Sequence, residues 1–93
     1  MNLYKSSENV LEQRYYLPIL TRISKKNPPI PNVRLKMAAF NELDTEEKRQ
    51  DMASHLWEEM DISISTARMK VRSFIERKRV LYNIEMDKIL RED

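Results

Sequence analysis

Donor side chains suited to nucleic acid gather in one stretch of the sequence, between residues 65 and 79. Lysine and arginine bind phosphates, and hydroxyl groups bind phosphates or base edges. Residues 64–82 hold six lysines and arginines against one acidic residue, which gives a net charge of +5. The pattern predicts contact with double-stranded DNA. The candidate DNA-binding residues are Ser65, Thr66, Arg68, Met69, Lys70, Arg72, Arg77, Lys78 and Arg79.

Two helices joined by a short turn are predicted to carry these donors. The apolar spacing of residues 52–60 predicts a helix that ends at Met60, four residues make the turn, and a second helix begins at Ser65 or Thr66. Ile62 is placed to pack inside the turn and fix the angle between the helices. This is the order of a helix-turn-helix, whose second helix enters the major groove of DNA. The inner face of that helix is predicted to hold Ala67, Val71 and Phe74.

The stretch from Leu56 to Arg68, LWEEMDISISTAR, resembles the pattern I-A-x-x-L-x-I-S-x-x-T-V-K of LuxR-type output domains and region 4 of bacterial sigma factors. Residues 71–75 continue the likeness to V-x-x-I-L. The resemblance implies a three- or four-helix DNA-binding domain, a transcriptional or DNA-transaction regulator, with its recognition helix over Ser65–Arg72. Two departures concern the packing of the helices: Trp57 stands where these families have alanine, and Asp61 replaces a small turn residue.

The residues also support a second function, that of a helical interaction subunit. Residues 44–63 hold two basic and seven acidic residues, a net charge of −5, directly before the basic stretch, and the whole chain carries only +2. The six methionines are typical of a surface that adapts to a partner. Apolar residues spread around more than one face of the final helix, which favours a homodimer or a protein partner there. They are Val71, Ile75, Val80, Leu81, Ile84, Ile89 and Leu90.

The composition argues against an enzyme. Cysteine is absent, so the sequence offers no disulfide, thiolate metal site or cysteine nucleophile. His55 is the single histidine, and we expect it to be a partly exposed helical residue. The sequence shows no pattern of a catalytic triad, a phosphate-binding loop or a set of metal ligands. We therefore expect no catalytic residues, cofactor, metal or small-molecule substrate.

The elements that hold the basic stretch are predicted to be helices in one domain spanning residues 1–93. Glycine is absent, which disfavours tight hairpins and most small β folds. We expect an all-α, compact bundle of four to five helices that contains the helix-turn-helix and ends in a long C-terminal helix. The predicted segments are 7–26, a proline-rich strap over 27–31 with Ile30 packed inward, and helices over 33–43, 45–60 and 65–90.

Helix ends and core residues follow from the same patterns. The caps are predicted at Ser6 or Ser7, at Asn32, at Asp44 or Thr45, and at Ser63 or Ser65. Pro18 should give two short helices or one kinked helix over 7–26. The predicted core consists of Val10, Leu11, Tyr15, Tyr16, Leu17, Leu20, Ile23, Leu35, Met37, Ala38, Phe40, Met52, Ala53, Leu56, Trp57, Met60, Ala67, Val71, Phe74, Ile75 and either Leu81 or Tyr82.

No apolar run approaches the length needed to cross a bilayer, and the first eight residues hold no signal-peptide core. We therefore expect a soluble intracellular protein of the cytoplasm or nucleus, without membrane contact.

Overall fold

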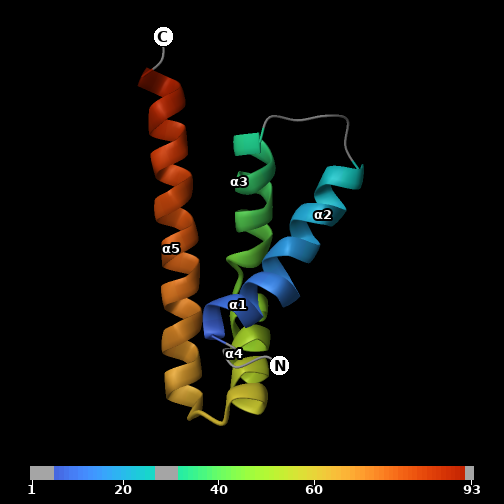
Figure 1. The fold of residues 1–93 in the computed structure, drawn as a ribbon, viewed down its shortest axis with the longest axis vertical. Helices are drawn as coiled ribbons and strands as arrows, with labels where there is room; N and C mark the ends of the chain where they lie inside the picture. Colours follow the sequence, from blue (N-terminus) through green and yellow to red (C-terminus); the bar gives the residue numbers. More distant parts are fainter. Residues whose placement is uncertain (1–5, 27–31, 92–93) are drawn as a thin grey trace.

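Four helical segments, and no strand, make up the part of the chain that the computed structural model describes, residues 6–26 and 32–91. Figure 1 shows the last helix, α5 (Ile64–Arg91), running the length of the molecule, with most of the shorter helices alongside it. The predicted all-α class and the long C-terminal helix are confirmed. The predicted strap over 27–31, with Ile30, lies outside the described residues.

The first segment is one continuous helix with a wide turn in the middle. It comprises α1 (Ser7–Leu11), a π-helical turn η1 (Glu12–Tyr16) and α2 (Leu17–Lys26). Ser6 caps it, because its side chain accepts from the backbone N–H of Asn9 at 3.0 Å. The wide turn ends at Tyr16, two residues before Pro18, whose ring would crowd the carbonyl of residue 14 in a regular helix. The helix therefore widens at the proline instead of breaking into two.

The wide turn decides which side of this helix is buried. Leu11, Tyr15, Ile19 and Ile23 all lie in the core at a constant spacing of four. A regular α-helix has 3.6 residues per turn, so such a row would drift around it, and the wider π turn compensates for part of that drift. The prediction that Leu17 is in the core is wrong, since Leu17 is 39% exposed, and Ile19 is buried instead.

Helices α3 (Asn32–Leu43) and α4 (Glu46–Met60) follow. Asn32 is the first residue of α3, so it lies inside the helix and not before it as a cap. Thr45 caps α4 by accepting from the backbone N–H of Lys48 at 3.2 Å. Ala39 and Leu43 are the buried residues of α3. Four other residues of this helix, which the sequence predicts to lie in the core, are only half-buried: Leu35, Met37, Ala38 and Phe40.

Helix α4 presents one side to the core and leaves Trp57 outside it. Met52, Ala53 and Leu56 are buried, and Met60 packs against them. Trp57 is 52% exposed, so the prediction that it anchors the core is wrong. The residue after Leu56 is turned by about 100° around the helix, which carries Trp57 away from the buried side. Trp57 thus does not separate α4 from α5, and the small residues Ala53 and Ala67 are buried on these two contacting helices.

The turn between α4 and α5 depends on two short polar residues. Asp61 adopts the left-handed conformation, with φ 51° and ψ 47°. Glycine is the residue that most often adopts this conformation directly after a helix. Aspartate adopts it more easily than most residues, which suits a chain without glycine. Ser63 then caps α5, because its hydroxyl accepts from the backbone N–H of Thr66 at 3.1 Å. Ile62 lies between them and packs against the core, as predicted.

Candidate nucleic-acid interface

The first three turns of α5 separate an apolar side from a donor side. Ala67, Val71, Phe74 and Ile75 are buried against the rest of the protein. The other side carries most of the residues that the sequence predicts to bind DNA. Ser65, Arg68, Met69, Lys70 and Arg72 are exposed, and Thr66 is half-buried. The structure therefore brings these six predicted residues together on one helix, with five of them open to solvent.

Arg68, Lys70 and Arg72 have no carboxylate partner among the described residues. Residues 64–75 contain no acidic side chain. No carboxylate of α4 forms an ion pair with them, although Glu46 lines a pocket together with Arg68 and Arg72. Glu59 pairs with Arg14 at 2.8 Å, Asp44 pairs with Arg49, and neither partner belongs to α5. These three cations are thus available to a ligand.

The other predicted cations already have partners within the chain. Arg77 pairs with Glu8 of α1 at 2.6 Å, and Arg79 pairs with Glu76 one turn earlier. Lys78 pairs with Glu12 at 2.6 Å and lies 4.2 Å from the centre of the Tyr16 ring. Its side chain is only 17% exposed. Lys78 therefore holds the first helix against α5, a role that the local sequence does not reveal.

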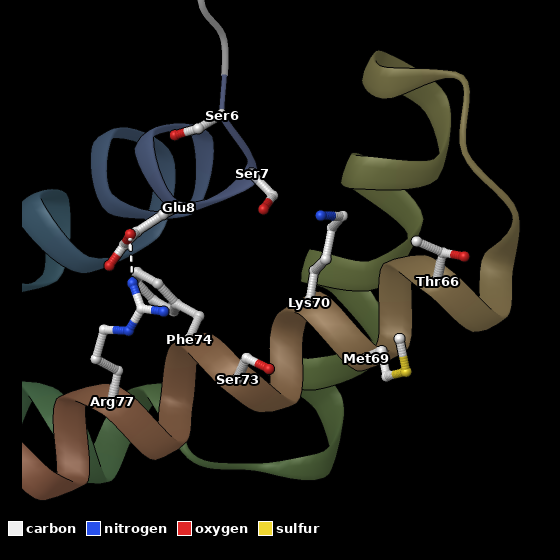
Figure 2. A pocket seen from close by; sticks show the side chains of 9 residues that line it. All are labelled: Ser6, Ser7, Glu8, Thr66, Met69, Lys70, Ser73, Phe74 and Arg77. Carbon is white, nitrogen blue, oxygen red and sulfur yellow. Dashed lines mark hydrogen bonds and ion pairs between the residues drawn. The ribbon is translucent and has the colours of Figure 1, made fainter.

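A groove of about 400 Å³ lies between the beginning of α1 and the donor side of α5. In Figure 2, Lys70 rises from α5 toward Ser7 of α1, while Met69 points the other way. The groove brings together hydroxyl groups, two cations and the carboxylate that pairs with Arg77. Its lining is Ser6, Ser7, Glu8, Thr66, Met69, Lys70, Ser73, Phe74 and Arg77. The sequence marks Ser6 and Ser7 only as caps, and nothing in it signals that they lie beside Lys70.

A polar cluster joins the first helix to α4 away from this groove. The Tyr15 hydroxyl donates to the carboxylate of Asp51 at 3.4 Å and lies 3.2 Å from Nδ1 of His55. His55 in turn has its Nε2 3.5 Å from Glu59. The His55 and Tyr15 rings meet edge to face, 5.8 Å apart. The cluster orients Tyr15 at the edge of the core, and it contains neither a serine nor a cysteine nucleophile.

Burial, the negative charge of Asp51 and the hydrogen bond to Asp51 together raise the pKa of Tyr15 from the ordinary value of 10.0 to about 12. Because the folded state favours the neutral phenol, the stability it contributes is complete below pH 10 and is lost as the pH rises through about 12. Urea unfolding across this range should show the free energy of unfolding falling more steeply for the unmodified chain than for Tyr15→Phe.

The remaining slope in Tyr15→Phe belongs in part to Tyr16, whose pKa is also raised by burial. Parallel stability curves for the two proteins would contradict the assignment to Tyr15. Unfolding at neutral pH provides the reference, since both tyrosines are then neutral in the folded and unfolded states.

Comparison with protein-family models, with curated proteins and with solved structures finds no match to this chain. Within residues 6–26 and 32–91, no helix is long and apolar enough to cross a membrane. The same residues contain no group of three or more histidine, aspartate or glutamate side chains arranged to hold a metal ion. Any functional assignment must therefore start from the side chains of the candidate interface.

Proposed function

We propose that this chain is a small, non-enzymatic DNA-binding protein, a transcriptional or DNA-transaction regulator that acts inside the cell and inserts α5 into the major groove. The observation that carries the proposal is the set of three exposed cations, Arg68, Lys70 and Arg72, without carboxylate partners on the helix that follows a three-residue turn. Such a helix offers its first turns to base edges and its flanking cations to phosphates.

The cations of α5 lie at two angular positions around the helix axis, and they form two rows with uncharged residues between them. Residues three or four apart lie on the same side of a helix, so Arg68 and Arg72 form one row. Lys70 lies in the other row, beside the groove with α1, and Arg77, which pairs with Glu8, follows it seven residues later. Ser65 and Met69 lie between the rows. The cations would contact the phosphates on the two sides of a major groove, and the neutral strip would face the bases.

The test is fluorescence anisotropy of labelled random-sequence duplex DNA, titrated with the protein at about 50 and 200 mM salt. We expect binding in the micromolar range or tighter at the lower salt and a steep loss at the higher salt, because each neutralised phosphate releases counterions. Absence of binding at the lower salt would overturn the proposal.

A second candidate function, that of an interaction subunit, is favoured by the exposure of large apolar side chains. Trp57 is 52% exposed on α4, and several apolar residues of α5 are exposed near the C-terminus. Exposed aromatic residues are common in protein interfaces. If the DNA titration shows no binding, a protein partner becomes the better explanation. Trp57→Ala should then weaken the capture of that partner while lowering the free energy of unfolding by less than about 1 kcal/mol.

A further inference from the structure

The C-terminal half of α5 leaves apolar side chains exposed on the side away from α3. Helix α3 packs along one side only, where Lys36 pairs with Glu85 at 2.7 Å and Met37 contacts Tyr82. Arg77, Val80, Ile84 and Asp87 are spaced by three or four residues, and we call them the outer stripe. The stripe lies on the other side of the helix, and Ile84 stands at its edge, where it also lines a pocket with Lys36 and Phe40 of α3. Val80 and Ile84 are 51% and 49% exposed. Leu81, at 53%, borders the stripe.

Charged residues at equal distances before and after Tyr82 have opposite signs in this half of α5. Arg77 and Asp87 each lie five residues from Tyr82, and Val80 and Ile84 each lie two residues from it. Arg79 and Glu85 are also equidistant, at three residues. A copy of the helix running in the reverse direction therefore places opposite charges level with each other and apolar residues level with apolar residues. We propose that two copies of this chain pair through antiparallel α5 helices, with the two-fold axis level with Tyr82.

The outer stripe fits this partner through reciprocal contacts. Val80 of each copy meets Ile84 of the other, and Arg77 meets Asp87, so every contact occurs twice, as two-fold symmetry requires. A parallel pair would set Arg77 against Arg77 and Asp87 against Asp87, which like-charge repulsion disfavours. The side chains of Arg77 and Asp87 are 61% and 60% exposed, which leaves both open to a second charge besides Glu8 and Arg91.

One consequence rests on the proposed DNA-binding function. Lys70, the middle cation of the interface, lies twelve residues before Tyr82. At 1.5 Å per residue, antiparallel pairing separates the two Lys70 positions by about 36 Å along the helix axis. Successive turns of the DNA major groove are about 34–36 Å apart. The dimer would thus present its two basic segments at the spacing of a two-fold symmetric site.

Sedimentation velocity in the absence of DNA tests the dimer independently of DNA binding. We expect the apparent mass to rise from 11.2 kDa toward twice that value as the protein concentration increases. Ile84→Glu should leave a monomer at every concentration. Ile89→Glu is the matched control, because Ile89 is equally exposed, at 48%, but lies about 140° around the helix from Ile84. A monomeric unmodified chain, or equal effects of the two variants, would overturn the proposal.

The absence of cysteine allows a direct test of direction and register. Val80→Cys and Ile84→Cys are prepared as separate proteins and oxidised alone or mixed. Antiparallel pairing predicts that the mixture forms disulfide-linked dimers in greater yield than either protein alone. Crosslinking within each single variant, with no gain on mixing, would indicate a parallel pair and overturn the proposed register.

Charge reversal tests the electrostatic part of the same interface. Arg77→Asp should weaken dimerisation at least about tenfold, because it places two carboxylates level with each other at both ends of the stripe. The double variant Arg77→Asp with Asp87→Arg should restore it. Failure of the double variant to recover, while it keeps the helix content of the unmodified chain, would contradict the pairing of residue 77 with residue 87.

Discussion

Leu56→Ala should lower the free energy of unfolding by about 2–5 kcal/mol, whereas Trp57→Ala, one residue later, should lower it by less than about 1 kcal/mol. The Leu56 side chain is completely buried among the core residues of α4 and its neighbours, so its removal leaves a cavity. The larger Trp57 side chain is 52% exposed, and its loss removes little core packing. The order of the two effects is opposite to that expected from side-chain size.

Urea unfolding followed by circular dichroism measures both effects at one dilute protein concentration. A small domain has about 5–15 kcal/mol of stability in total, so Leu56→Ala is expected to approach the limit of folding. Leu56→Met preserves most of the volume and serves as a milder variant that should cost under about 1.5 kcal/mol. A loss of about 3 kcal/mol in Trp57→Ala would contradict the exposed position of Trp57.

Replacing Arg68, Lys70 and Arg72 together with alanine should weaken DNA binding at least about tenfold and reduce the salt dependence. Each lost phosphate contact lowers the slope of log K against log salt by about 0.9, so three contacts lower it by nearly three. The thermal midpoint should barely change, because these side chains are exposed and have no ion-pair partner in the described part of the chain.

The chain offers a control with the same change in charge. Lys25, Arg34 and Lys48 also have no carboxylate partner within the described ranges, and they lie on α2, α3 and α4. Their triple alanine variant has the same net charge as the first and should keep most of the affinity. Equal losses in the two variants would show that net charge drives binding, and would remove the assignment to α5.

The local sequence determined the helices and most of their ends. The caps Ser6, Thr45 and Ser63 accept from backbone N–H groups three residues later, so their choice requires no distant contact. The buried residues Ala67, Val71, Phe74 and Ile75 also follow from helical periodicity alone. The exposed donors of the candidate interface lie on the opposite side of the same helix, so they too could be predicted before the fold was known.

Only the tertiary structure decided which cations are free and which sides of the first helix and α4 are buried. Arg77 and Lys78 resemble Arg68 and Lys70 in the sequence, but Glu8 and Glu12 reach them from more than sixty residues away. The wide turn before Pro18 selects Ile19 over Leu17, and the packing of α4 turns Trp57 outward. Helical periodicity fixes which residues share a side, whereas the side that becomes buried depends on neighbours that the chain brings together only on folding.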